Sequence, residues 1–561
     1  MQKLWNIHPH NKKAVEELRR ALKVPAIVAQ LLMNRGISDT VEAKRFLQVS
    51  RKDLYDPFLL KDMDKTVERI EKARRKKERV LIYGDYDVDG VTSSALLIKT
   101  LRALGLEVIN YIPHRVDEGY GLNHEIAPIA KKQGVSLLIT VDCGITANSE
   151  IETLNALGIE VIVIDHHEPS ELLPKAFAII NSKRKDCEYP CKDLAAVGTV
   201  AKLIQALTGE MTDETLNLVA LGTISDVVPL TGENRIFVKE GLATIHITKN
   251  KGLRALLDVA KIDGKELSPF HVGFILGPRL NAAGRMDSAQ TALDLFLTED
   301  TKQAQQLARA LEAHNLDRQR QQRDIVQNAL EMIEQNVNFN DQKVIVLNKD
   351  GWHRGLLGIV ASKIVEKYYR PAIVISTDNG VGSASARSIE GFHLYEALSR
   401  CSTLLVDYGG HKGAAGLTIK EENIDLLRKQ INQLADELLE VKKLVPTILI
   451  DCAIDLGVIN LELAQLIKSM EPYGEGNPSP VFCSKNLTVT SRPMVMGRET
   501  LKFWVTDGSQ KISAVGFGMA KYQDMITPKA KIDLAYEIII DDWNKAPTPQ
   551  LKLKDIKLAD N

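Results

Sequence analysis

Hydrophobic and polar positions follow two different patterns along this chain. From residue 79 onward, short apolar runs rich in Val, Ile and Leu alternate with longer segments whose apolar residues recur at helical spacing. The first pattern is typical of buried strands and the second of amphipathic helices. The expected strands are Arg79–Gly84, Glu107–Ile112, Ser136–Val141 and Glu160–Ile164, and the expected helices are Gly90–Leu104, His124–Gln133 and Asn148–Leu157. This order predicts right-handed βαβ units and a parallel sheet.

The rest of the chain divides into segments with different patterns of apolar and polar residues. Residues 1–50 contain short amphipathic helices, with Asp39 as the expected N-cap of one of them. Thr301–Gln335 lacks Gly and Pro and is rich in Ala, Gln, Leu and Arg, which predicts one long helix between two domains. A second α/β pattern starts at Lys343, and short strand-like runs beyond Val445 predict a small barrel of the OB type.

The predicted fold class is therefore α/β. A parallel-sheet domain is joined by a long helix to a smaller α/β domain, and a C-terminal OB-fold β-barrel follows. The predicted boundaries are 1–50 for an N-terminal helical extension, 51–298 for the catalytic domain, 299–340 for the connecting helix, 341–444 for the second α/β domain and 445–561 for the barrel. A chain of 561 residues is too long for one hydrophobic core, which agrees with several domains.

Composition and charge exclude some classes of protein. Apolar residues make up 44% and charged residues 26% of the chain, as in ordinary folded proteins. The 72 basic and 73 acidic side chains almost cancel, so a nucleic-acid partner has to be argued from local patches. We expect a cytoplasmic protein without a membrane partner, because the N-terminus has no apolar signal segment and no window reaches membrane-spanning length.

Acidic and histidine side chains gather at the ends of the predicted strands. They are Asp85, Asp87 and Asp89 after the first strand, Asp142 after the third, Asp165, His166 and His167 after the fourth, and Asp226 in a later apolar helical stretch. Because neighbouring parallel strands end at one crevice, we expect these side chains to share a site. A single acid of this kind is better explained as a helix cap or a solvated loop residue, but their joint occurrence favours a metal site. A calcium-binding EF-hand loop also begins with three alternating acids, yet its twelfth position is here Leu96 instead of Glu.

This donor set predicts a centre with two divalent cations. Crowded carboxylates raise one another's pKa, and cations relieve that repulsion. Two ions about 3.5–4 Å apart can clamp a phosphate oxygen and activate water. Mixed Asp and His ligands favour Mn²⁺, with Mg²⁺ as the second choice.

The motifs also carry a family resemblance. The series YGDYDVDG, VDCG, IDHHEP and ISDVVP resembles, in this order, the four signatures of the DHH phosphoesterase superfamily. The first signature, together with GPRLNAAGRM at residues 277–286, is similar to the RecJ branch, whose members are single-strand-specific exonucleases that degrade DNA from the 5′ end in recombination and repair. GGHKGAAG at residues 409–416 is similar to the terminal motif of the DHHA1 domain, which binds substrate beside the DHH domain.

The resemblance implies a role for each of these side chains. It makes Asp87, Asp89, Asp142, His166 and Asp226 the metal ligands, with Asp142 as the bridging ligand. It makes His167 a ligand or an electrophilic partner of the scissile phosphate. Asp165 would orient the two histidines from behind, and Asp85 would bind the metal directly or through water.

Substrate-binding residues are predicted in both α/β domains. The loop after the second strand offers His114 and Arg115, and the GPRLNAAGRM stretch offers Arg279, Asn281 and Arg285 at expected element edges. A plain βα turn is an equal alternative for the first loop. In the second domain, the resemblance implies that Ser385, Arg387, Gly410 and His411 hold the terminal 5′ phosphate.

We therefore predict a metal-dependent 5′→3′ single-stranded DNA exonuclease that releases 5′-mononucleotides. The alternatives are a DHH phosphodiesterase acting on short oligonucleotides or cyclic dinucleotides, and a non-catalytic replication scaffold. The expected partners are single-stranded DNA with a 5′ end, a single-strand-binding protein and a RecQ-type helicase, and a monomer is expected. Four aromatic side chains, Tyr473, Phe482, Phe503 and Trp504, are candidates for base stacking in the barrel.

Overall fold

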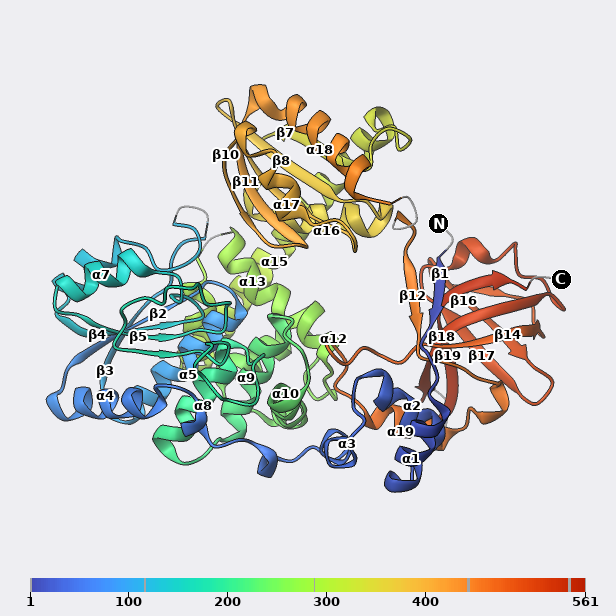
Figure 1. Ribbon diagram of the computed structural model, residues 1–561. Coiled ribbons are helices and arrows are strands. Elements are labelled where there is room, and N and C mark those ends of the chain that lie inside the picture. Colours follow the sequence, from blue (N-terminus) through green and yellow to red (C-terminus); the bar gives the residue numbers. More distant parts are fainter. Residues whose placement is uncertain (1–2, 116–117, 287, 441–443, 543–545, 560–561) are drawn as a thin grey trace. The chain divides into compact units, whose positions relative to one another are not determined.

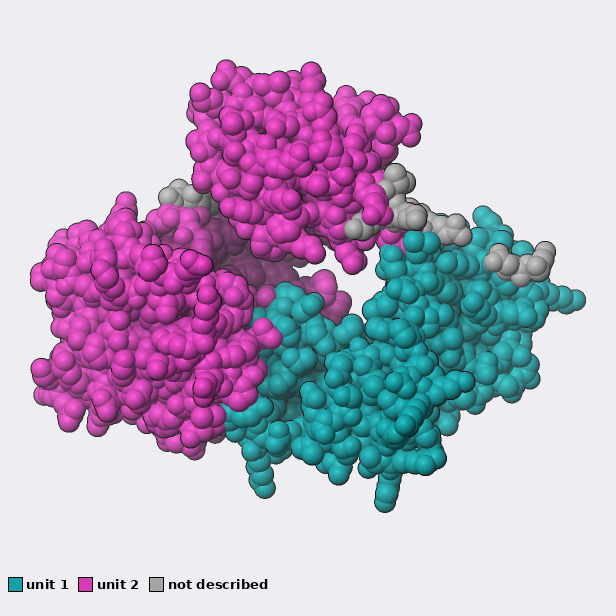
Figure 2. Space-filling view, in the orientation of Figure 1, with its two compact units in different colours: residues 1–55, 227–240, 447–561 teal, residues 56–226, 241–446 magenta. Residues whose placement is uncertain are grey.

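The structure is a computed structural model that describes residues 3–115, 118–286, 288–440, 444–542 and 546–559 (Figure 1). The chain divides into two compact units (Figure 2). Unit 1 contains Met1–Tyr55, Val227–Glu240 and Thr447–Asn561, and unit 2 contains Asp56–Asp226 and Gly241–Pro446. Within the described ranges, no helix combines the length and hydropathy that a membrane span requires.

A five-stranded parallel sheet forms the first half of unit 2. Its strands are β2 (Arg79–Gly84), β3 (Glu107–Tyr111), β4 (Val135–Val141), β5 (Glu160–Ile164) and β6 (Ala178–Ile180). Their order in the sheet is β3-β2-β4-β5-β6, and all neighbours are parallel. The β-branched residues of β5 are fully buried, which is why this run is continuously apolar instead of alternating with polar positions.

Helices connect these strands and extend the unit beyond the sheet. Those between or before the strands are α4 (Met63–Lys76), α5 (Val88–Ala103), α6 (Ile126–Lys132) and α7 (Asn148–Ala156). Those that follow are α8 (Ala196–Thr208), α9 (Asp213–Ser225), α11 (Lys251–Val259), α12 (Pro269–His271), a π-helical turn η4 (Val272–Leu276), α13 (Gly277–Met286), α14 (Gln290–Leu297) and α15 (Thr301–Asn336). Most of α10 (Gly232–Thr244) belongs to unit 1. The single long helix α15 confirms the helix predicted from the sequence.

A second five-stranded sheet completes unit 2. It contains β7 (Ile345–Asp350), β8 (Ala372–Asp378), β9 (Val381–Arg387), β10 (Leu405–Gly410) and β11 (Ala414–Lys420), with helices α16 (Leu357–Tyr368), α17 (Leu394–Ser399) and α18 (Ile424–Leu438). The order is β10-β11-β9-β8-β7, and only β7 and β8 are parallel. The glycine-rich stretch forms the β10–β11 hairpin.

Unit 1 is built around the C-terminal sheet. Its strands are β13 (Cys452–Ala453), β14 (Phe482–Val489), β15 (Met494–Met496), β16 (Thr500–Thr506), β17 (Lys511–Gly516), β18 (Lys531–Asp541) and β19 (Thr548–Leu558), and helix α19 (Leu461–Ser469) precedes β14. The order is β13-β14-β18-β19-β17-β16-β15, and β14 also pairs with β16. That extra pairing closes five strands into a ring of the OB type.

The N-terminal segment belongs to the same unit as the barrel. Strand β1 (Leu4–Ile7) pairs in parallel with β12 (Thr447–Ile450). Helices α1 (Lys12–Leu22), α2 (Ala26–Asn34) and α3 (Thr40–Leu47) contribute to one hydrophobic core with the barrel strands. Asp39 caps α3 by accepting hydrogen bonds from two backbone N–H groups, as predicted. Residues 1–50 therefore pack as part of the barrel unit.

Candidate active site

The strand order places a crevice at the ends of β2 and β4. The chain leaves β2 for β3 on one side and then crosses to β4 on the other side of β2. Ligands in open α/β sheets bind at such a switch point, outside the carboxyl ends of the strands. Asp85, Asp87 and Asp89 follow β2, and Asp142 follows β4. The acids at the ends of these two strands lie close together, as the sequence predicted.

Two helix N-termini meet the carboxylates after β2. Asp87 is the N-cap of α5, and its Oδ1 accepts hydrogen bonds from the backbone N–H groups of Asp89 and Gly90 at 2.9 and 3.1 Å. Asp89 is buried and accepts from the backbone N–H groups of Ala196 and Val197, at the start of α8, at 2.8 and 2.9 Å. Helix N-termini attract negative charge, and these hydrogen bonds fix the positions of both side chains.

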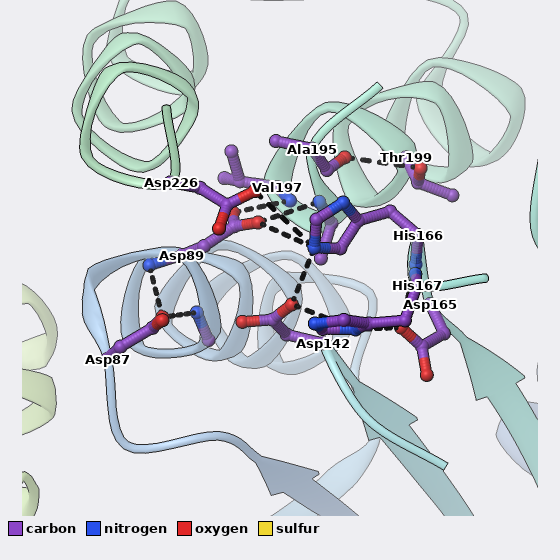
Figure 3. A network of polar contacts seen from close by, with 12 residues as sticks. Asp87, Asp89, Asp142, Asp165, His166, His167, Ala195, Val197, Thr199 and Asp226 are labelled. Atoms are coloured by element: carbon purple, nitrogen blue, oxygen red, sulfur yellow. Dashed lines mark hydrogen bonds and ion pairs between the residues drawn. The ribbon is translucent and has the colours of Figure 1, made fainter. Parts of the chain in front are cut away.

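His166 lies at the centre of the cluster (Figure 3). Its Nε2 is 3.2 Å from Oδ1 of Asp142, 3.4 Å from Oδ2 of Asp226 and 3.9 Å from Oδ2 of Asp89. Asp226 caps the C-terminal end of α9. Asp142 has a backbone φ of 63°, a left-handed conformation that is strained for a residue with a Cβ atom and is commonly found at functional sites.

Asp165 holds both histidines from behind. Its Oδ1 accepts hydrogen bonds from the backbone N–H groups of His166 and His167, and it lies 2.7 Å from Nδ1 of His167. Its Oδ2 accepts from the backbone N–H of Ile145 at 3.0 Å. Although burial acts to raise it, the hydrogen bond from His167 lowers the pKa of Asp165, so the carboxylate stays ionised. The same contact, against the effect of burial, raises the pKa of His167.

The cluster has the electrostatics of a cation site. Burial and then Asp87 raise the pKa of Asp85 to about 8, and the same two causes raise the pKa of Asp226 to about 7. Burial and neighbouring carboxylates raise the pKa values of Asp89 and Asp142 well above their usual range. Carboxylates that repel one another in a buried site are stabilised by bound cations.

Unpaired buried atoms show that the donors fit metal ions. Oδ1 of Asp85, Oδ1 of Asp142 and Nε2 of His166 are buried without a hydrogen-bond partner among the described residues. Burial, and then the charge of His167, lower the pKa of His166 to about 3, so its ring is neutral, the form in which histidine binds metals. Three groups have donor atoms within 4.8 Å of one another: Asp142, His166 and His167; Asp89, His166 and Asp226; and Asp85, Asp87 and Asp142.

One contact in the site could not be anticipated. The hydroxyl of Tyr120 donates to the backbone carbonyl of Asp142 at 3.2 Å and lies 3.0 Å from Nδ1 of His167. Glu118 ties the loop that carries Tyr120, because its carboxylate accepts from the backbone N–H of His114, the Tyr111 hydroxyl and the Asn123 amide at 2.7 to 2.8 Å. The glycines on either side of Tyr120 were the only signal in the sequence.

An arginine cluster, formed by Arg115, Arg285 and Arg387, adjoins the carboxylates. The Arg115 guanidinium lies over the Tyr86 ring, 4.7 Å from its centroid. Arg285 is half-buried and donates to the backbone carbonyl of Gly355 at 3.1 Å. Burial, followed by the charges of Arg115, Arg318 and Arg387, lowers the pKa of Arg285 to about 10, so it remains charged at neutral pH. No ion pair joins Arg285 to an acid in the described part of the chain, so its charge is available to an anion.

The other predicted substrate residues fall into two groups. Arg279 forms an ion pair with Glu312 of α15 at 2.7 Å and donates to the Ile275 carbonyl, so its charge is already compensated. Arg279 lies in the first turn of α13 and Arg285 in its last turn, and Asn281 is half-buried between them.

The second-domain residues are neighbours across strands. Gly409 lies opposite Gly416, and Gly416 lies opposite Ser385, so the β10–β11 hairpin that carries Gly410 and His411 pairs with β9. Nη1 of Arg387 donates to Oγ of Ser385 at 3.3 Å. His411 is exposed at the hairpin tip. Small residues and a guanidinium group therefore lie at the same end of the neighbouring strands β10, β11 and β9.

The four aromatic side chains that were candidates for base stacking differ in their exposure to solvent. Phe482 and Phe503 are buried in the core of unit 1, and the hydroxyl of the half-buried Tyr473 donates to the carbonyl of Ile467. Only Trp504 is exposed among the four, and Nζ of Lys511 lies 5.4 Å from its ring centroid. Trp504 alone is placed to stack on a base.

Comparison with known proteins gives consistent results along the whole chain. The model of the DHH family N-terminal domain matches residues 79–223, that of the DHHA1 domain matches 341–437, and that of the RecJ OB domain matches 450–555. The single-stranded-DNA-specific exonuclease RecJ of Bacillus subtilis is 39% identical over 99% of this chain and 71% of its own length.

Solved structures agree with these matches. RecJ of Thermus thermophilus in complex with Mn²⁺ superposes with a TM-score of 0.84, at 29% identity, over all of this chain and 80% of that one. The Mg²⁺ complex of the same protein gives a TM-score of 0.79 at 27% identity, over all of this chain and 79% of that one.

Proposed function

Because this chain belongs to the RecJ family of single-stranded-DNA-specific exonucleases, we propose that it is a metal-dependent exodeoxyribonuclease of DNA recombination and repair. It degrades single-stranded DNA from the 5′ end and releases 5′-mononucleotides by phosphodiester hydrolysis. The observation that carries the proposal is the adjacency of two oppositely charged clusters. One is a carboxylate and histidine cluster with unpaired buried donors, and the other is the arginine cluster, which has no acidic partners among the described residues.

The residues have distinct parts in this proposal. Asp87, Asp89, Asp142, His166 and Asp226 hold divalent cations, Mn²⁺ by preference or Mg²⁺, and Asp85 completes the set. When bound, the cations supply a Lewis acid and an activated water for attack on the scissile phosphate. His167 faces the phosphate, and Asp165 fixes its ring through the contact at Nδ1.

Arginines set the position of the strand. Burial, and then the charge of Arg115, lower the pKa values of Arg285 and Arg387, and a terminal phosphate between the three arginines would satisfy all three charges. Ser385 and the hairpin that carries Gly410 and His411 add hydrogen-bond donors at the same end of the second sheet. An anchored terminal phosphate presents only the first linkage to the metal cluster, which gives cleavage from the end.

Two other functions fit less well. A phosphodiesterase of short oligonucleotides or cyclic dinucleotides has no use for an OB module with an exposed Trp504. A scaffold without activity has no need of seven donors gathered around unpaired buried atoms. A monomeric state, a cytoplasmic location, and partnership with a single-strand-binding protein and a RecQ-type helicase are part of the proposal and rest on the sequence resemblance.

The test compares end-labelled strands. Single-stranded DNA labelled at the 5′ or the 3′ end is incubated with Mn²⁺, Mg²⁺ or chelator. We expect immediate release of the 5′ label, loss of activity with chelator, and no activity in Asp142→Ala. Asp258→Ala is the matched control, because it removes an exposed carboxylate from α11. Release of the 3′ label first, or an active Asp142→Ala protein, would contradict the proposal.

A further inference from the structure

An aromatic pair projects from the turn that leads into α13. Phe270 and Phe274 are 60% and 73% exposed, and their rings stack on each other with centroids 5.0 Å apart and an interplanar angle of 25°. They are four residues apart, so both lie on one face of the helical segment. Val272 and Leu276, between and after them, are fully buried and anchor the backbone. The segment thus holds two large rings in solvent on a fixed support.

The exposure of these two rings indicates a binding surface. Both rings lie mostly in solvent, so most of the stabilisation that burial of a Phe side chain contributes is not gained at either position. Neighbouring exposed apolar side chains mark interaction sites more often than isolated ones. The π-helical turn η4, which carries Phe274, is itself a feature that occurs frequently at functional sites.

The position of the pair along α13 identifies the ligand. A Cβ atom at Gly277 would lie 3.0 Å from Oγ of Ser225, the residue before Asp226, so the start of α13 adjoins the metal cluster. A Cβ atom at Gly284 would lie 3.0 Å from the backbone oxygen of Tyr86, so the end of α13 adjoins the acids after β2 and the arginine cluster.

Helix α13 therefore runs along the cluster with different chemistry at its two ends. Arg285 lies at its C-terminal end, and Phe274 lies just before its N-terminal end. The ten residues of the helix span ~15 Å. If the terminal 5′ phosphate occupies the arginine end and the first linkage lies at the metal cluster, the rest of the strand continues toward the phenylalanines.

We propose that Phe270 and Phe274 form a stacking platform for the bases of single-stranded DNA on the 3′ side of the scissile linkage. The proposal rests on the proposed function. Exposed aromatic rings bind bases of any sequence, because every base has a flat π face. The platform would keep the shortened strand bound while its new 5′ end moves to the arginine cluster. It would therefore contribute to affinity for long strands and to repeated cleavage, but not to hydrolysis of the terminal bond.

The experiment separates base stacking from catalysis. Binding of a 5′-phosphorylated single strand is measured by fluorescence anisotropy in chelator, and the same strand is made with abasic sites from the third to the sixth nucleotide. We expect Phe270→Ala/Phe274→Ala to weaken binding of the normal strand roughly 5- to 100-fold and to bind the abasic strand nearly as well as the wild type does. Phe270→Tyr/Phe274→Tyr should retain wild-type affinity.

Two controls make the outcome decisive. Phe339→Ala removes one ring of another stacked pair in unit 2, formed with Tyr368, and should leave binding unchanged. Hydrolysis of a 5′-phosphorylated dinucleotide with Mn²⁺ should proceed equally in wild type and in Phe270→Ala/Phe274→Ala. Unchanged binding of the normal strand, as expected if the pair docks a protein instead, or an equal loss on the abasic strand, would overturn the platform. Failure of the wild type to cleave either substrate would instead overturn the proposed function.

Discussion

Replacing Asp165 by Asn tests whether this residue sets the orientation of His167. The substitution keeps the size of the side chain and removes one negative charge from a fully buried position. We expect a moderate loss of stability and a larger loss of turnover, without a change in affinity for the DNA strand. The arginines that we propose as the anchor of the strand are not among the hydrogen-bond partners of Asp165, so only the metal-cluster side of the site is altered.

The magnitude follows from the hydrogen bonds of the carboxylate. Oδ1 faces three donors, on His166 and His167, and Oδ2 faces one, the backbone N–H of Ile145. An Asn side chain can place its oxygen at only one of these positions. With the oxygen toward the three donors, its NH₂ group opposes the Ile145 N–H and leaves a buried donor unsatisfied, which costs about 1–3 kcal/mol. Loss of the charge that holds His167 should lower kcat by about 10- to 100-fold, as for other residues that support metal sites.

The assay measures kcat, KM and thermal unfolding for Asp165→Asn and a matched control. Asp62→Asn is the control, because Asp62 also accepts a backbone N–H bond, from Ile179, and pairs with Arg184. It should lower stability and leave kcat per folded molecule unchanged. If Asp165→Asn retained wild-type kcat, or if its KM rose in place of a fall in kcat, the orienting role of Asp165 would be wrong.

Three further predictions address other parts of the chain. Tyr120→Phe removes a hydroxyl hydrogen bond worth about 0.5–1.5 kcal/mol, so kcat should fall roughly 2- to 10-fold while KM for DNA stays constant; an unchanged kcat in steady-state assays would contradict a role in positioning His167. Arg285→Met should reduce the preference for a 5′-phosphate over a 5′-hydroxyl strand by roughly 10- to 100-fold, measured as the ratio of kcat/KM values, and an unaltered ratio would place the terminal phosphate elsewhere. Partial burial acts to raise the pKa of Asp507, but hydrogen bonds from Ser509 lower it to about 2. This carboxylate therefore stabilises the barrel above about pH 4, and the stabilisation is lost as the pH falls toward 2. Asp507→Asn should therefore unfold more easily by about 1 kcal/mol at pH 7, a value reduced for solvent exposure, and the difference from wild type should shrink in urea titrations on acidification; a difference independent of pH would refute the assignment.

The sequence predicted the local elements where one physical rule dominates. Glu160–Ile164 is a strand with the expected bounds, because an uninterrupted β-branched run fits only a strand covered on both faces. The acids after β2 and β4 meet because parallel strands end at one edge. Asp39 caps α3 because its side chain satisfies two free N–H groups at once.

Contacts between distant segments were not predictable in this way. Strand β1 pairs with β12 across most of the chain, and four residues of ordinary composition carry no signal for such a partner. The tip of the β10–β11 hairpin, at residues 409–416, lacks the alternation of polar and apolar residues, because its glycines have no side chains to alternate. Tyr120 reaches His167 only through a loop that Glu118 ties together, and nothing in the local pattern indicates that fold-back.

The two halves of the site would neutralise each other if they were free to pair. Arg115 and the carboxylate of Asp85 are close enough for the arginine to lower the pKa of the acid, yet no ion pair joins them in the described ranges. The Tyr86 ring holds the Arg115 guanidinium, and the Gly355 carbonyl holds Arg285. Each arginine is thus retained by a neutral partner, which leaves its charge uncompensated. Under the proposed function, this separation leaves the carboxylates to bind cations and the guanidinium groups to bind phosphate, so that one crevice can bind both.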